Sequence, residues 1–164
     1  MAGGFPISGL IGREHVMRSW GLSEGEAIHT STFAGNPLGC AMAAAVIDEL
    51  STGNWGDRIA RFEVKIRSDL EAISTEFPNL IGEVRGWGMM WGIDLIEGGH
   101  PEKANGRLAL ELMDRLRQAG YLVLPCGTSG NVLSVTPPFV ITNEQWEGFS
   151  STLQLSIEKA TQTR

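Results

Sequence analysis

In the second half of the chain, apolar residues recur at spacings of three and four, the period of an amphipathic helix. The longest such segment spans about 55–77 and stops at Pro78. Its apolar side consists of Ile59, Phe62, Ile66, Leu70, Ile73 and Phe77. The same period predicts a helix over about 102–119 and a last helix after Thr142, which forms a capping box with Gln145. The last helix is expected to bury Trp146, Phe149, Leu153, Ile157 and Ala160.

Short apolar runs between these helices predict strands, because they are brief and are bounded by glycine, proline or asparagine. The expected strands are 80–85, 89–95, 121–124 and 132–135, and 97–101 is expected to be a turn. Nearer the N-terminus we expect a short buried strand at 7–11 and a short helix at 13–20. Alternating helices and short strands favour an α/β or α+β fold.

The segment 29–50, HTSTFAGNPLGCAMAAAVIDEL, joins a hydroxyl-rich loop to a helix with little side-chain bulk. Asn36 and Pro37 stand in the order that a helix start prefers, a capping side chain followed by proline. Alanines then fill most positions, so this helix can lie close to another backbone, and Gly53 is expected to end it. Hydroxyls and backbone amides beside a helix N-terminus suit an anion such as a phosphate.

Composition narrows the class of protein. The 164 residues carry a formal net charge of −6, which argues against a nucleic-acid-binding surface. No apolar run approaches the roughly 20 residues that cross a bilayer, and the start of the chain lacks the basic region of a signal peptide. Cys40 and Cys126 are far apart and have no CxxC partner, which favours free thiols in a reducing cytoplasm.

Candidate catalytic residues are few. His15 and His100 are interpreted as surface residues, whereas His29 adjoins the hydroxyl-rich loop. No spacing of histidine, cysteine or carboxylate residues predicts a metal site. The glycine-rich stretches 35–39 and 126–131 are interpreted as a helix start and a hairpin connection. Spacing alone therefore predicts an α/β domain with an anion-binding loop.

Four ordered blocks carry a more specific signal. They are AGGFPISGLIGR at 2–13, HTSTFAGNPLGCAMAAAVIDEL at 29–50, VRGWGMMWGIDL at 84–95 and GNVLSVTPPFVIT at 130–142. In this order they resemble the C-terminal portion of class III aminotransferases, the ω-type pyridoxal-phosphate enzymes. The resemblance covers nearly all of this chain but well under half of a usual family member.

The resemblance implies a fold-type-I α/β architecture, in which a large domain holds the cofactor and a smaller C-terminal domain closes over it. Residues 1–54 would then be the incomplete C-terminal end of the large domain. Residues 55–164 would be the small α+β domain. Family members are typically homodimers with active sites at the subunit interface.

Thr32 matches the family threonine that binds the phosphate of pyridoxal 5'-phosphate, usually across the dimer interface. Gly35 and Asn36 match structural neighbours of that threonine, and Arg85 matches a recurrent arginine to which we assign a structural role. The family lysine that holds the cofactor would fall just before Met1, and the first lysine present is Lys65. No catalytic residue is therefore assigned within this chain, and no substrate-binding residue is identified.

Besides lacking the family lysine, the chain departs from the family pattern at Ser134. Many members have an arginine at this position, which binds the substrate carboxylate. Serine cannot reproduce that bidentate contact, so an amine, or another carboxylate-binding residue, becomes an alternative. We expect a segment of an aminotransferase that acts on an amino donor and a 2-oxo acid and is inactive alone, acting as a homodimer or with a complementary N-terminal half. The alternatives are a non-catalytic remnant that pairs with a full-length relative, and a racemase, mutase or lyase of the same fold.

Overall fold

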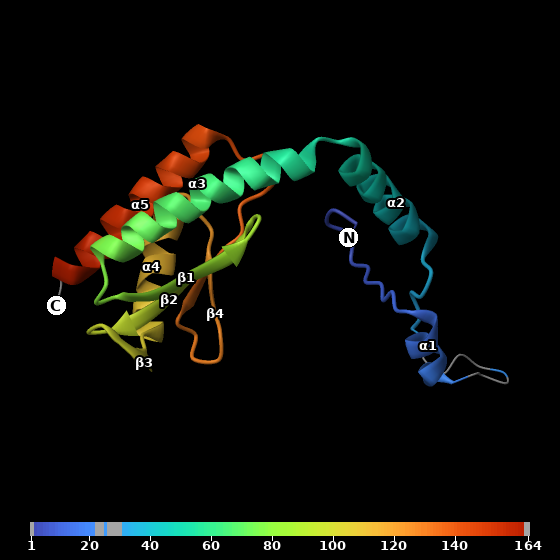
Figure 1. Ribbon diagram of the computed structural model, residues 1–164, viewed down its shortest axis with the longest axis horizontal. Coiled ribbons are helices and arrows are strands. Elements are labelled where there is room, and N and C mark those ends of the chain that lie inside the picture. The colour runs from blue at the N-terminus through green and yellow to red at the C-terminus, as the bar shows by residue number, and fades with distance from the viewer. Residues whose placement is uncertain (1, 22–24, 26–30, 163–164) are drawn as a thin grey trace. The chain divides into compact units, whose positions relative to one another are not determined.

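The computed structural model describes residues 2–21, 25 and 31–162 (Figure 1). The chain divides into two compact units, Met1–Asn54 and Trp55–Arg164. The boundary falls between the end of the alanine-rich helix and the start of the long amphipathic helix. Each unit is described by itself.

The helices of the first unit lie among long stretches of irregular backbone. They are α1 (Glu14–Met17), the 3-10 turn η1 (Arg18–Trp20) and α2 (Pro37–Thr52). The short helix expected at 13–20 and the helix that ends at Gly53 are both confirmed. In α2 only Gly39 and Ala43 are buried, because the described residues of this unit cover little of its surface.

The prediction of a buried strand at 7–11 is wrong. This segment forms no strand, and the side chains of Leu10 and Ile11 are 71% and 99% exposed. A strand needs a neighbour for its backbone hydrogen bonds, and the one bridge described in this unit joins Ala2 to Phe5. The apolar composition of this segment therefore predicted that its side chains are buried, but the described residues do not cover them.

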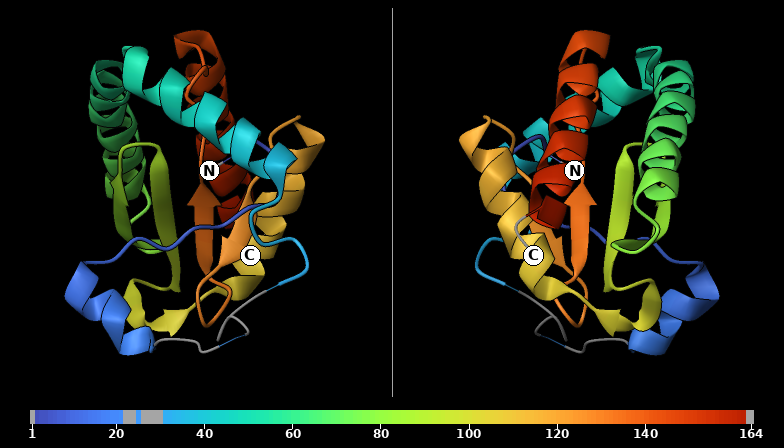
Figure 2. Two further views of the ribbon diagram at one scale, coloured as in Figure 1. Left: turned by 90° about the vertical axis from the view of Figure 1, so that its right-hand side faces the viewer. Right: turned by 90° about the vertical axis from the view of Figure 1, so that its left-hand side faces the viewer.

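The second unit is an antiparallel sheet with helices packed on one side (Figures 1 and 2). The strands run in the order β1-β2-β5-β4, and β3 also pairs with β2. The helices are α3 (Trp55–Glu76), α4 (Gly106–Gln118) and α5 (Asn143–Gln162). The strands are β1 (Ile81–Trp87), β2 (Met90–Glu97), β3 (His100–Ala104), β4 (Leu124–Cys126) and β5 (Val132–Val135). The unit is a mixed α/β structure, as predicted.

Three expected boundaries were wrong. The turn placed at 97–101 contracts to Gly98 and Gly99, whose φ angles of 62° and 76° favour glycine, and β3 follows at once. Helix α4 therefore begins only after Asn105, whose buried side chain accepts a hydrogen bond from the Leu108 N–H at 3.0 Å. The strand expected at 121–124 begins only at Leu124 and forms β4. Residues 121–123, which follow the end of α4, are irregular backbone.

The core lies between the helices and one face of the sheet. Alternate strand residues reach it, among them Trp91, Ile93, Leu95, Leu133 and Val135. All five residues expected to be buried in α5 are buried, and they belong to this core. The opposite face of the sheet exposes Trp87, Met90 and Leu124.

Candidate functional site

Thr32 lies at the start of an exposed turn that leads into α2. The Ala34 N–H donates to the Ser31 carbonyl at 3.0 Å, and the Asn36 N–H donates to the Phe33 carbonyl at 3.1 Å. Backbone hydrogen bonds thus fix the turn. Among the described residues, the Thr32 hydroxyl has no hydrogen-bond partner, so it is available to a ligand.

The N-terminus of α2 follows this turn directly. The Asn36 side chain accepts from the Gly39 N–H at 3.1 Å, and Pro37 occupies the first helical position, as predicted. The 16-residue helix directs the positive end of its dipole toward the turn. A hydroxyl at such a position fits the phosphate of a cofactor. His29, which adjoins this loop in sequence, lies outside the described residues.

Arg85 and Ser134 lie in one row across the sheet of the second unit. Arg85 of β1 is opposite Gly92 of β2, which is in turn opposite Ser134 of β5. The Arg85 guanidinium lies 2.8 Å from a Glu83 carboxylate oxygen and 3.9 Å from one of Asp94. Sequence reasoning treated Arg85 and Ser134 separately, because only the strand register brings them together.

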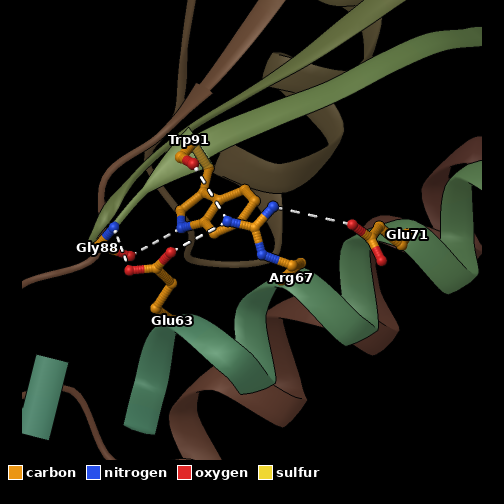
Figure 3. Close-up of polar contacts among 6 residues, drawn as sticks. Glu63, Arg67, Glu71, Gly88 and Trp91 are labelled. Atoms are coloured by element: carbon orange, nitrogen blue, oxygen red, sulfur yellow. Dashed lines mark hydrogen bonds and ion pairs between the residues drawn. The ribbon is translucent and has the colours of Figure 1, made fainter. Parts of the chain in front are cut away.

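A polar cluster ties the hairpin of β1 and β2 to α3 (Figure 3). The Arg67 guanidinium lies over the Trp91 ring and 3.0 Å from the Glu63 carboxylate. The other Glu63 oxygen accepts from the Gly88 N–H at 2.9 Å, and the Trp91 indole donates to the Gly88 carbonyl at 2.9 Å. The cluster fixes the hairpin tip, which carries the exposed Trp87. No local sequence pattern predicted this cluster, because it joins α3 to a hairpin more than 20 residues further along the chain.

The three lysines of the chain, Lys65, Lys103 and Lys159, all belong to the second unit. Lys65 lies 3.1 Å from the Glu147 carboxylate and 3.6 Å from that of Asp69. A hydrogen bond to Glu147 is the main cause that raises the pKa of Lys65. A protonated amine held by two carboxylates is a poor nucleophile, so Lys65 has the character of a structural residue.

The remaining histidines lie at the surface. His15 is in α1, and the His100 Nδ1 lies 3.3 Å from the Glu102 carboxylate. Among the described residues, no three histidine, cysteine or acidic side chains gather as metal ligands. In the same part of the chain, no helix has the length and apolar character needed to cross a membrane.

Comparison with known proteins defines the family. The model of the class III aminotransferase family matches residues 1–157. The 4-aminobutyrate aminotransferase GabT of Escherichia coli is 35% identical over 148 residues, which are 88% of this chain and 33% of GabT. The 5-aminovalerate aminotransferase DavT of Pseudomonas aeruginosa is 33% identical over 90% of this chain and 33% of its own length.

Solved structures agree with this match. A Bacillus anthracis aminotransferase has a TM-score of 0.73 and 26% identity, covering 84% of this chain and 32% of that one. An Arthrobacter phospholyase, solved with phosphoethanolamine, has a TM-score of 0.71 and 31% identity over 80% of this chain and 31% of its own. The chain belongs to the class III aminotransferases, which depend on pyridoxal phosphate and have the fold-type-I architecture. It spans about a third of the length of these relatives.

Proposed function

We propose that this chain forms the C-terminal part of a pyridoxal-phosphate-dependent aminotransferase, which transfers an amino group between an amino donor and a 2-oxo acid. The family match over residues 1–157 carries this proposal. In it, residues 1–54 complete the large cofactor-binding domain and residues 55–164 form the small domain. The assembled enzyme is proposed to be cytoplasmic and to act as a homodimer or with a complementary N-terminal half.

Within that enzyme, Thr32 is proposed to hold the cofactor phosphate. Its exposed hydroxyl beside the N-terminus of α2 supports the assignment, since both features favour an anion. When bound, pyridoxal phosphate acts as the electron sink of the reaction. The contribution of this chain is to anchor and orient the phosphate end of the cofactor.

The lysine that attaches the cofactor is proposed to come from outside these 164 residues. Lys65 is held by Asp69 and Glu147, while Lys103 lies on the exposed edge strand β3. Lys159 lies in the last turns of α5. Since none of them adjoins the Thr32 turn in sequence or shares its unit, the chain alone is proposed to be inactive.

Borohydride reduction tests this proposal. The purified chain is incubated with pyridoxal phosphate, reduced, digested and analysed by mass spectrometry, with the urea-unfolded chain as the control for non-specific lysine labelling. We expect no lysine in the folded chain to be labelled more than in the unfolded one, and no transamination. Selective labelling of one lysine in the folded chain, or amino transfer by that chain, contradicts the proposal.

A lyase is the second candidate. Two observations favour it: the similarity to the phospholyase solved with phosphoethanolamine, and the short Ser134 side chain in the row with Arg85 and Gly92. A serine offers one hydroxyl where an arginine would offer a fork of donors, so this position selects less strongly for a carboxylate. An amine substrate is accordingly proposed beside the amino-acid one. Product analysis of the assembled enzyme distinguishes amino transfer from elimination.

A further inference from the structure

A polar hollow of about 430 Å³ lies between α3 and the start of α5, within the second unit. Three cationic side chains of α3, those of Arg58, Arg61 and Lys65, line one side of it. They recur at spacings of three and four, so they share one face of the helix. The other side is formed by residues 142–144. The clustering is notable because the whole chain carries a net charge of −6.

Two of these three charges have no acidic partner in the part of the chain that the structure describes. The Arg58 guanidinium donates to the carbonyls of Phe139 at 2.7 Å and Ile141 at 2.6 Å, which fixes its position but leaves its charge uncompensated. Among the described residues, Arg61 makes no hydrogen bond or ion pair. Lys65 differs, because Glu147 and Asp69 already compensate it.

Like charges one helical turn apart repel, so Arg58 and Arg61 destabilise α3 unless an anion lies between them. Of the described residues that line the hollow, one is acidic, Glu144. Its carboxylate is engaged by its own backbone N–H and by the Thr142 hydroxyl, which lower its pKa. Glu144 is therefore ionised, and together with Asp69 and Glu147 it balances the three cations in number. What the hollow retains is the guanidinium of Arg61 and the part of the Arg58 guanidinium that the two carbonyls leave free, neither of them ion-paired among the described residues.

We propose that this hollow binds a phosphate-type dianion, with Arg58 and Arg61 as the principal ligands. A single carboxylate is satisfied by one guanidinium, whereas a phosphate offers separate oxygens to two. Arg58 is held in place by the two loop carbonyls, so only Arg61 loses freedom on binding.

The N-terminus of α5 is not the source of this affinity. Its first turn is already capped, since the Thr142 hydroxyl accepts from the Gln145 N–H at 3.2 Å and the Gln145 side chain accepts from the Thr142 N–H at 2.9 Å. The site depends on side chains of α3 and is independent of the proposed transaminase activity. All its residues belong to the unit Trp55–Arg164, whereas Thr32 belongs to the other unit.

Titration of the ¹⁵N-labelled 164-residue chain with inorganic phosphate, at ionic strength held constant with sodium chloride, tests the proposal. We expect saturable shifts in the amide resonances of residues 58–65 and 142–144. Arg61→Gln should weaken binding about fivefold or more, the effect of losing one charge-assisted contact. Arg107→Gln is the matched control, because Arg107 is exposed on α4 and loses the same charge. It should leave the affinity unchanged.

Three results overturn the proposal. One is a linear response to phosphate without saturation, which indicates general screening by salt. Another is equal weakening by Arg61→Gln and Arg107→Gln, which indicates a response to net charge alone. The third is tighter binding of citrate than of phosphate in the same titration, which assigns the hollow to carboxylates.

Discussion

The guanidinium carbon of Arg67 lies 4.7 Å from the ring centroid of Trp91. Arg67 belongs to α3 and Trp91 to β2, so this contact joins a helix to the strand beneath it. Trp91 is 3% exposed, whereas the Arg67 side chain is 42% exposed. The cation covers the face of a core aromatic ring while its charge stays in contact with water.

Arg67→Ala should lower the free energy of unfolding by about 1–2 kcal/mol, from the loss of the cation–π contact and of packing on the indole. The ion pairs with Glu63 and Glu71 add little at this exposure. Urea denaturation followed by tryptophan fluorescence measures the change. Arg117→Ala is the control, because it removes an exposed arginine whose ion pair among the described residues is with Asp114. Equal losses in the two variants would show that the ring contact contributes nothing.

Local patterns predicted most of the second unit. The three-and-four spacing located α3, and the Thr142–Gln145 capping box located the start of α5. These features depend on residues close in sequence, so they can be predicted without knowledge of the fold. Strand β3 was missed because HPEKA carries no apolar alternation, and it forms only because β2 offers it a neighbouring edge.

The long-range contacts could not be predicted in the same way. Arg58 reaches the carbonyl of Phe139, 81 positions away, and the Arg85–Ser134 row depends on the register of three strands. The Thr32 turn was located through its motif, and the structure adds that its hydroxyl is exposed. The strand expected at 7–11 failed for the opposite reason: a local pattern was present without a partner strand.

Leu153→Ala should be among the most destabilising changes in the chain, because this side chain is fully buried in the core. Truncating a buried leucine removes apolar contacts and leaves a cavity, which costs about 2–5 kcal/mol. Leu155→Ala is the matched control, since Leu155 lies two positions later in α5 and is 53% exposed. It should change the free energy of unfolding by less than about 0.5 kcal/mol. Comparable shifts of the urea midpoint in the two variants would show that the core-facing side of α5 is assigned wrongly.

Glu144 should make the stability of the chain depend on pH in the acidic range. A hydrogen bond from its own backbone N–H, followed by one from Thr142, holds the pKa of Glu144 below its usual value. A lowered folded pKa means that the stabilisation is complete above the unfolded pKa of about 4.3 and is lost as pH falls through the folded pKa. Glu144→Gln should therefore flatten the decline in melting temperature from about pH 5 downward.

The control for this pH profile is Glu158→Gln, which removes the same charge from the far end of α5. That carboxylate lies away from the positive end of the helix dipole, so its removal should leave the acidic decline in place. Profiles of the wild type and Glu144→Gln that run parallel from pH 6 to pH 3 would contradict the predicted role of Glu144.

Thr32→Val should weaken non-covalent binding of pyridoxal phosphate about fivefold, because valine keeps the shape of threonine but removes one hydrogen bond to the phosphate. Thr32→Ser should retain the affinity. Both are compared in the Arg61→Gln background by quenching of tryptophan fluorescence, so that the hollow beside α3 contributes less to the signal. Ser134→Ala, which removes a hydroxyl from β5, is the control and should have no effect on phosphate binding. Unchanged affinity in Thr32→Val, or absence of saturable binding by the Arg61→Gln parent, would contradict the assignment of this turn to the cofactor phosphate.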